Sequence, residues 1–204
     1  MENFAEKMIC KICGNDTLRA FSAEIMKKYT VNYFQCPNCE FVQTENPYWL
    51  KEAYESPMNF TDTGIMVRNQ RFSKVTASLL ILFFDKKAKF LDFAGGYGVF
   101  TRIMRDMGFD FYWDDPYTKN LLARGFEKSD GEIYQVVTTF ESFEHYENPL
   151  EEIGKITAIS ENIIFSTEPV AFPFPEKDWW YYAFDWCHNG FWRNTGLNQY
   201  DLGA

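Results

Sequence analysis

The spacing of apolar residues changes along the 204-residue chain, and these changes divide it into helical and strand-like segments. From Ile65 to Leu82, apolar residues recur at spacings of three, four and seven, which is typical of one face of an amphipathic helix. The apolar positions of this face are Ile65, Phe72, Val75, Leu79 and Leu82. Four short apolar runs then predict buried strands, at 89–93, 109–115, 133–140 and 162–167. Three segments between them are predicted as helices, at about 99–107, 117–124 and 149–158.

Strands that alternate with helices in this way predict a parallel sheet covered on both faces. The expected fold class is therefore α/β, with a Rossmann-like, doubly wound sheet. In such sheets a ligand binds beyond the carboxyl ends of the strands.

The first 45 residues differ from the rest because they hold four of the five cysteines between short strand-like pieces. The pattern is C-x₂-C-x₂₂-C-x₂-C, formed by Cys10, Cys13, Cys36 and Cys39. Two such pairs can supply a tetrahedral zinc site with no open ligand position, so the metal would be structural. The alternatives are four free thiols or a redox pair. We expect a zinc ribbon over 1–45, a connector over 46–64 and the α/β domain over 65–204.

Composition narrows the possible partners and compartment. The net charge of −9 argues against a nonspecific nucleic-acid binder and against docking on an anionic membrane, because both need a basic surface. A nucleic-acid reader stays open as a third hypothesis, because the cysteine-rich part carries the basic residues Lys7, Lys11, Arg19, Lys27 and Lys28. The first residues show no leader pattern, and the longest apolar stretch, 77–84, is too short to span a bilayer. We therefore expect a cytoplasmic protein.

The segment LDFAGGYG, residues 91–98, follows a predicted strand and opens a predicted helix. Glycines at such a junction permit positive φ and let a ligand approach the main chain. The dinucleotide fingerprint is incomplete, because Gly96 and Gly98 are followed by Thr101 where a third small residue belongs. The alternative is a tight turn that binds nothing.

The same segment resembles the first motif of class I S-adenosylmethionine-dependent methyltransferases, in which a Gly-rich turn holds the methionine part of the cofactor. The resemblance implies that the cofactor lies against five residues: Asp92, Ala94, Gly95, Gly96 and Gly98. YWDDP, residues 112–116, resembles the acidic end of the second strand, which binds the ribose hydroxyls. A carboxylate can accept two hydroxyl hydrogen bonds. Asp115 is the first candidate, and Asp114 is the alternative.

VVTTFESFEH, residues 136–145, is similar to the fourth-strand segment of the same superfamily, which lines the methionine end of the cofactor and the mouth of the substrate site. Glu141 would there orient the amino group of the cofactor. With the ribbon and the flanking segments, the resemblance extends to bacterial methyltransferases that modify small molecules or sugars. It implies that Tyr54 and the 60–69 segment help to cover the cofactor, and that the acceptor is a small polar molecule such as a sugar.

Methyl transfer can require a base that removes a proton from the acceptor. His145 lies just past the fourth strand and is the leading candidate, because histidine titrates near neutral pH. Glu144 is the second candidate. The alternative for His145 is a packing residue. His188 lies near the position of a histidine expected in the resembling family, but its flanking residues do not match.

The resembling fold carries seven strands, whereas only 37 residues follow the predicted strand at 162–167. We therefore expect the C-terminal part to be truncated and to lack the last strand pair. A homodimer, or the aromatic segment at 178–186, would then cover the open edge of the sheet. This aromatic segment is also read as a wall of the acceptor pocket, or as a lid or interface. The missing pair favours a rival hypothesis of a non-catalytic relative that binds the cofactor or a protein partner.

Overall fold

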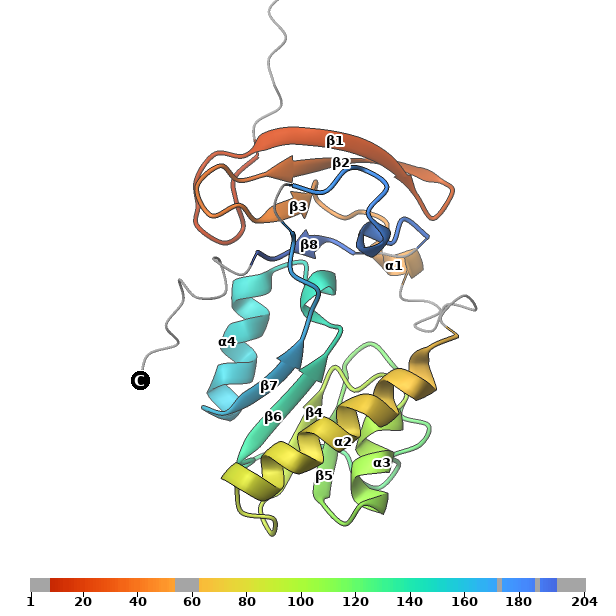
Figure 1. Cartoon of the computed structure of the whole chain (residues 1–204), viewed down its shortest axis with the longest axis vertical. Helices are drawn as coiled ribbons and strands as arrows, with labels where there is room; N and C mark the ends of the chain where they lie inside the picture. Colours follow the sequence, from red (N-terminus) through yellow and green to blue (C-terminus); the bar gives the residue numbers. More distant parts are fainter. Residues whose placement is uncertain (1–7, 54–62, 172–173, 186–187, 194–204) are drawn as a thin grey trace, which may run out of the picture. The chain divides into compact units, whose positions relative to one another are not determined.

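The computed structural model describes residues 8–53, 63–171, 174–185 and 188–193 (Figure 1). Contacts divide the chain into two compact units. The first comprises Met1–Ala53, Ser142–Glu152 and Thr167–Ala204, and the second comprises Tyr54–Glu141 and Ile153–Ser166. The predicted ribbon at 1–45 thus lies in a unit that also takes in two later parts of the chain.

An antiparallel sheet organises the first unit. Its strands are β1 (Leu18–Ile25), β2 (Tyr29–Gln35), β3 (Val42–Thr44) and β8 (Gly190–Phe191), and they are hydrogen-bonded in that order. β1 and β2 form a hairpin, and β8 brings a late part of the chain alongside β3, with Phe191 opposite Val42. The short helices of this unit are α1 (Leu50–Ala53), η1 (Phe143–His145) and η2 (Trp180–Tyr182).

Aromatic side chains fill the interior of the first unit. Tyr33 of β2, Tyr182 of η2 and Phe191 of β8 are all buried. The ring of Tyr33 stacks on that of Phe21 at 4.5 Å, and the ring of Tyr182 meets that of Phe191 edge-on at 5.1 Å. The aromatic segment therefore contributes core residues to the unit that contains the cysteines.

A parallel sheet organises the second unit, in the order β5 (Asp110–Asp114), β4 (Lys89–Phe93), β6 (Val136–Phe140) and β7 (Ile163–Ser166). Helices α2 (Ile65–Phe83) and α3 (Val99–Asp106) lie on the same face of this sheet (Figure 1). Helix α4 (Pro149–Ile159) begins in the first unit and ends in the second. The predicted α/β class with a Rossmann-like sheet is confirmed.

The core of the second unit lies between that sheet face and the two helices. Phe90, Phe111 and Val136 are register partners on three neighbouring strands, so they form one row on the sheet. Leu80 of α2 and Met104 of α3 pack on this row and are fully buried. Within the described residues, β7 pairs only with β6, and no further strand joins this sheet.

The helix predicted at 117–124 is wrong. This segment is irregular, and its backbone N–H groups donate to acceptors other than those of a helix. Asp115 Oδ1 accepts from Tyr117 and Thr118 N–H, and the carbonyl of Tyr97 accepts from Leu121 and Leu122 N–H. An aspartate that accepts backbone bonds two and three residues ahead favours a turn over a helix interior.

The buried face of α2 also differs from prediction. Its buried residues are Ser73, Thr76, Ala77 and Leu80. Val75 and Leu82, which define the predicted apolar face, are 54% and 71% exposed. No helix among the described residues has the length and hydropathy needed to cross a bilayer.

Candidate cofactor site and metal centre

The candidate cofactor residues gather at one edge of the parallel sheet. Because β4, β5 and β6 run parallel, their C-terminal ends and the residues that follow meet at this edge, which we call the carboxyl edge. The 94–98 loop follows β4, Asp115 follows β5, and Glu141 follows β6. The edge thus collects the predicted cofactor residues that the structure describes. Tyr54, also predicted to contact the cofactor, lies outside the described residues.

The three glycines in the loop after β4 have different surroundings. A Cβ on Gly95 would lie 2.7 Å from Cδ1 of Trp113 and 2.8 Å from Oδ2 of Asp92. A Cβ on Gly98 would lie 2.9 Å from Cβ of Ala123. Gly96 has a φ of +53° but nothing within 4 Å of the position of a Cβ, so its main chain faces open space. That opening is where a ligand can approach the backbone.

Two non-glycine residues at the carboxyl edge have a left-handed backbone conformation: Ala94 with φ +56° and Glu141 with φ +50°. Such a conformation costs about 1–3 kcal/mol at a non-glycine residue and is found preferentially at functional sites. Both residues come directly after neighbouring strands, β4 and β6. Strain at two adjacent strand ends supports a functional role for this edge.

Asp92 is buried, with 3% of its surface exposed. Thr101 Oγ1 of α3 donates to Oδ2 at 2.9 Å, and Thr138 Oγ1 of β6 donates to Oδ1 at 3.2 Å. Burial raises the pKa of Asp92 to about 7, although both hydrogen bonds oppose the rise, and the nearby Asp115 carboxylate adds to it. The carboxyl therefore ties α3 and β6 to β4 from inside the unit.

The two acids at the end of β5 have different surroundings. Oδ2 of Asp115 accepts from Gly96 N–H at 2.9 Å, and its Oδ1 accepts from two backbone N–H groups of the following turn. Oδ2 of Asp114 lies 3.0 Å from the ammonium of Lys128. Asp115 is thus bonded to the glycine loop, whereas Asp114 is held in an ion pair with another part of the chain.

Glu141 is fixed by Ser166 at the end of β7. The Ser166 hydroxyl donates to Oε1 of Glu141 at 2.6 Å, and the N–H of Glu141 donates to the Ser166 carbonyl at 3.2 Å. A carboxylate in this position can also accept from an ammonium group.

The two predicted bases belong to the first unit. Glu144 and His145 end η1, and Glu144 is 1% exposed. The imidazole of His188 stands edge-on to that of His145, with ring centroids 4.8 Å apart. Burial lowers the pKa of His188 to about 4, and its neighbour His145 adds to the shift. His188 was not predicted as a site residue, because its flanking residues do not match those of the resembling family. No local sequence pattern links it to Glu144 and His145.

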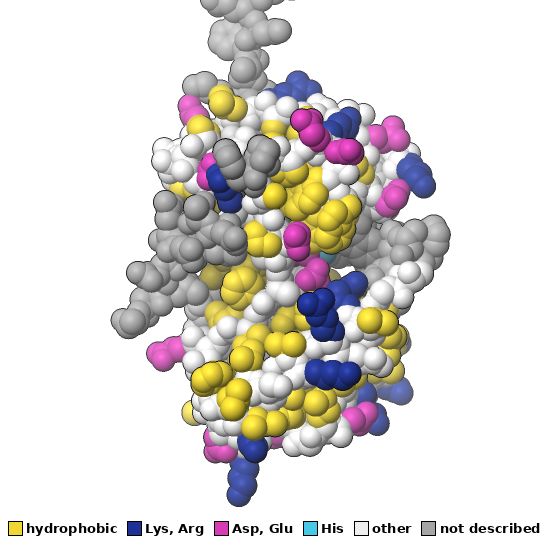
Figure 2. Space-filling model, in the orientation of Figure 1, with side chains coloured by type: hydrophobic (Ala, Val, Ile, Leu, Met, Phe, Trp, Pro, Cys, Tyr) yellow, Lys and Arg dark blue, Asp and Glu magenta, His cyan; other side chains and the backbone are white. Residues whose placement is uncertain are grey.

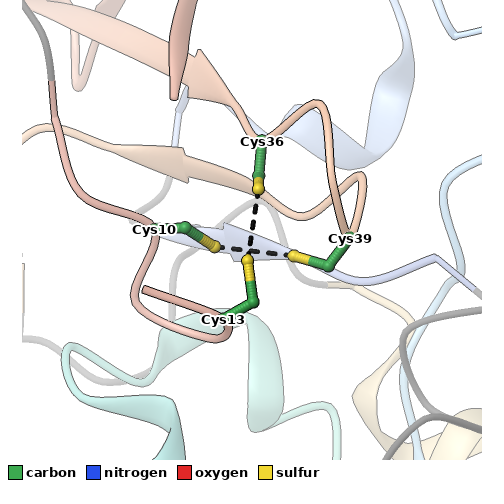
Figure 3. A group of neighbouring side chains, drawn as sticks. All are labelled: Cys10, Cys13, Cys36 and Cys39. Carbon is green, nitrogen blue, oxygen red and sulfur yellow. Dashed lines mark hydrogen bonds between the residues drawn. The ribbon is translucent and has the colours of Figure 1, made fainter. Parts of the chain in front are cut away.

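The four cysteines form one cluster, in which the sulfurs point toward one another (Figure 3). The Cys10 and Cys39 sulfurs are 3.5 Å apart, and those of Cys13 and Cys36 are 3.4 Å apart. Tetrahedral zinc with bonds of about 2.3 Å sets its sulfurs roughly 3.8 Å apart, which is close to this arrangement. None of the four is in a disulfide.

Hydrogen bonds from N–H groups reach sulfurs of the cluster, whereas burial raises the pKa of the Cys10 and Cys39 thiols. The backbone N–H of Ile12 donates to the sulfur of Cys10 at 3.4 Å, and the side chain of Asn15 donates to that of Cys13 at 3.3 Å. Burial raises the pKa of the Cys13 thiol, but hydrogen bonds from Asn15 and the neighbouring thiols outweigh it and bring the pKa to about 6. Thiolates are the form that binds metal.

Residues 67–200 match the family model described as "Methyltransferase domain". The match covers more than half of the chain and includes the whole of the glycine loop. The chain belongs to this methyltransferase domain family. No curated protein matches the chain.

Solved structures with a similar fold include three of the plantazolicin methyltransferase BpumL. The structure in complex with SAH is 16% identical over 74% of this chain and 72% of that chain, with a TM-score of 0.46. The complex with a pentazolic desmethylPZN analogue and SAH is 15% identical over 76% and 70%, with a TM-score of 0.47. The complex with a monoazolic analogue and SAH is 14% identical over 76% and 70%, with a TM-score of 0.48.

Proposed function

We propose that the protein binds S-adenosylmethionine at the carboxyl edge and transfers its methyl group to a small polar acceptor, with sugars as the first class to test. Membership in the methyltransferase domain family supports the reaction class. The open backbone at Gly96, with no atom within 4 Å of a Cβ there, is the observation that carries the cofactor site. The residues present fit the cofactor, because carboxylates, the uncovered backbone of Gly96 and small residues meet at one edge.

Each side chain of the edge takes a distinct role in this proposal. Gly96 lets the cofactor approach the main chain, whereas Gly98 allows the loop to pack closely on Ala123. Asp92 ties β4, which precedes the loop, to α3 and β6. Asp115 accepts hydrogen bonds from the ribose hydroxyls, and Glu141 accepts from the amino group. When bound, the cofactor supplies an electrophilic methyl group on a sulfonium.

The acceptor must lose a proton when its oxygen, nitrogen or carbon gains the methyl group. The bound cofactor would supply the methyl group with loss of its methyl–sulfur bond and would leave as the neutral thioether S-adenosylhomocysteine. We assign proton removal to His145, with Glu144 as the second candidate. The burial of Glu144 and the edge-on packing of His145 against His188 would hold a base in one orientation.

The four-cysteine cluster is proposed to hold a structural zinc ion. Thiolate ligands favour zinc, and four protein ligands leave no position for a substrate. The ion would stabilise the first unit and take no part in methyl transfer.

Calorimetric titration with S-adenosylmethionine and S-adenosylhomocysteine tests the cofactor site. We expect a dissociation constant between about 1 μM and about 1 mM, the usual range of substrate affinities. Gly96→Arg should abolish the binding heat by filling the open space. Gly131→Arg is the matched control, because Gly131 also has positive φ and free space, but precedes β6 and so lies away from the carboxyl edge.

The same titration separates the two acids. Asp115→Asn should weaken binding by about tenfold or more, since a lost charge-assisted hydrogen bond is worth roughly 1.5–3 kcal/mol. Asp114→Asn should leave the affinity nearly unchanged, because that carboxylate is paired with Lys128. No heat with the wild-type protein, or equal loss in Gly131→Arg, would contradict the proposed site. Binding without release of S-adenosylhomocysteine for any acceptor would favour the non-catalytic relative.

A further inference from the structure

Three side chains outside the cysteine cluster come together in the first unit. Glu144 and His145 lie on η1, and His188 comes from the segment before β8. One carboxylate oxygen and one ring nitrogen from each histidine all lie within 4.8 Å of one another. Two imidazoles and a carboxylate are ligands that divalent transition ions take together in proteins.

The spacing of these atoms suits an ion between them. Bonds of about 2.0–2.2 Å place the ligand atoms of one ion roughly 3–4 Å apart. Atoms within 4.8 Å of one another therefore need to draw closer by about 1 Å, which side-chain rotations can supply.

The hydrogen bond of His188 is an independent sign of a ligand. Its Nδ1 lies 2.7 Å from the carbonyl oxygen of Tyr181. A carbonyl only accepts, so Nδ1 carries the proton and Nε2 keeps a free lone pair. Metal-binding histidines commonly donate their second N–H to a carbonyl in this way, which fixes the tautomer and the direction of the ring.

Asn189 holds the other two residues in place. Its backbone N–H donates to the Glu144 carbonyl at 2.6 Å, and its side-chain amide donates to the His145 carbonyl at 3.1 Å. The Asn189 side-chain oxygen is buried and accepts no hydrogen bond from the described residues. A water molecule on a neighbouring ion would supply the missing donor.

Burial adds a reason for positive charge at this place. The Glu144 side chain is 1% exposed, and its Oε2 accepts from the Thr167 hydroxyl at 3.3 Å. A buried carboxylate is stabilised by an opposite charge, which a divalent ion provides.

We propose that Glu144, His145 and His188 form a second metal site, separate from the four cysteines, for a divalent transition ion such as Zn²⁺, Fe²⁺ or Mn²⁺. Three protein ligands leave positions open for water or for an acceptor hydroxyl, and such an ion lowers the pKa of the bound group. An ion on the ring nitrogen of His145 prevents that nitrogen from accepting a proton. If turnover requires the ion, the role of His145 changes from base to ligand.

Metal counting on the full-length protein, with no cofactor added, tests the site. The protein is loaded with Zn²⁺, passed over a desalting column and analysed by inductively coupled plasma mass spectrometry. We expect two ions in the wild type, one in Glu144→Gln and one in His188→Gln. Glu147→Gln is the matched control and should keep both, because Glu147 is an exposed glutamate three residues from Glu144.

The ion that remains in the Glu144 and His188 variants also shows that the first unit still folds. Titration of the EDTA-treated protein with Co²⁺ distinguishes the sites, since thiolate ligation adds a charge-transfer band that nitrogen and oxygen ligands do not. A weaker second transition in Glu144→Gln, with the thiolate band unchanged, supports the proposal. A single ion in the wild type, or the same loss in Glu147→Gln, overturns it. The outcome is independent of methyl transfer, so failure of one proposal is distinguishable from failure of the other.

Discussion

At the scale of single residues, the glycine loop shows how one motif can serve several physical needs. The sequence pattern predicted an accessible main chain at 94–98, but it did not distinguish among the three glycines. In the structure, Gly95 and Gly98 are required because neighbouring side chains leave no room for a Cβ. Only Gly96 faces open space, so a larger side chain there meets no neighbouring atom and adds only the strain of its positive φ.

Asp92 is expected to make the stability of the protein depend on pH. Because burial raises its pKa to about 7, above roughly 3.9 in an unfolded chain, the folded state keeps a proton that the unfolded chain releases. The free energy of unfolding should therefore fall as pH rises from about 4 through about 7, by at most about 1.4 kcal/mol per pH unit. Asp92→Asn, which has no such proton, should lose this dependence and become more stable than the wild type at alkaline pH.

Urea unfolding midpoints, measured at intervals across that pH range, check the effect of Asp92. Asp130→Asn serves as the control, because Asp130 is exposed and lies in the same unit. The substitution makes the same chemical change, from a carboxyl to an amide, at a position that is not buried. Parallel pH curves for wild type and Asp92→Asn would show that the buried carboxyl does not titrate in this window.

At the scale of elements, local patterns predicted the second unit well. The predicted strand at 89–93 has the bounds of β4, and the predicted helix from residue 65 is α2. These segments carry strong periodicity and clear end signals, so little depends on distant residues. The 117–124 segment failed because its partners, the Tyr97 carbonyl and the Asp115 side chain, lie outside any local helical pattern.

The face of α2 shows a second limit of periodicity. Small residues, Ser73, Thr76 and Ala77, face the core and let the helix approach the sheet, whereas several large apolar residues face outward. Figure 2 shows hydrophobic side chains gathered over α2 on the visible face. Counting apolar residues therefore favoured the wrong side of the helix at Val75 and Leu82.

Leu80 and Leu82 provide a matched test of this orientation. Leu80 is fully buried in the core of the second unit, and Leu82 is 71% exposed on the same helix. Leu80→Ala should lower the free energy of unfolding by about 2–5 kcal/mol, because it removes buried methyl groups and leaves a cavity. Leu82→Ala should change it by less than about 0.5 kcal/mol, as expected for a surface position. Chemical unfolding of the two variants measures both changes. Equal losses of unfolding free energy would contradict this orientation of α2.

At the scale of the whole molecule, the first unit could not have been predicted from local signals. It is built from three separate parts of the chain, and β8 pairs with β3 across almost 150 residues of sequence. The sequence predicted the cysteine cluster correctly, because its spacing is a local signature. It did not predict that the aromatic segment joins the core of the same unit, or that His188 approaches Glu144 and His145.

Removal of metal from the cysteine cluster should therefore unfold the first unit and spare the parallel sheet. Structural zinc contributes on the order of 10 kcal/mol to folding in small zinc domains. Without it, Trp49 and Trp192, now 1% and 2% exposed, should become accessible, and tryptophan emission should shift to longer wavelength. The helical circular dichroism should largely remain, because the long helix α2 belongs to the second unit. Treatment with a strong chelator measures both signals, and Cys36→Ser should reproduce the result without chelator. A shift of the emission together with loss of the helical signal would mean that the two units fold as one cooperative structure.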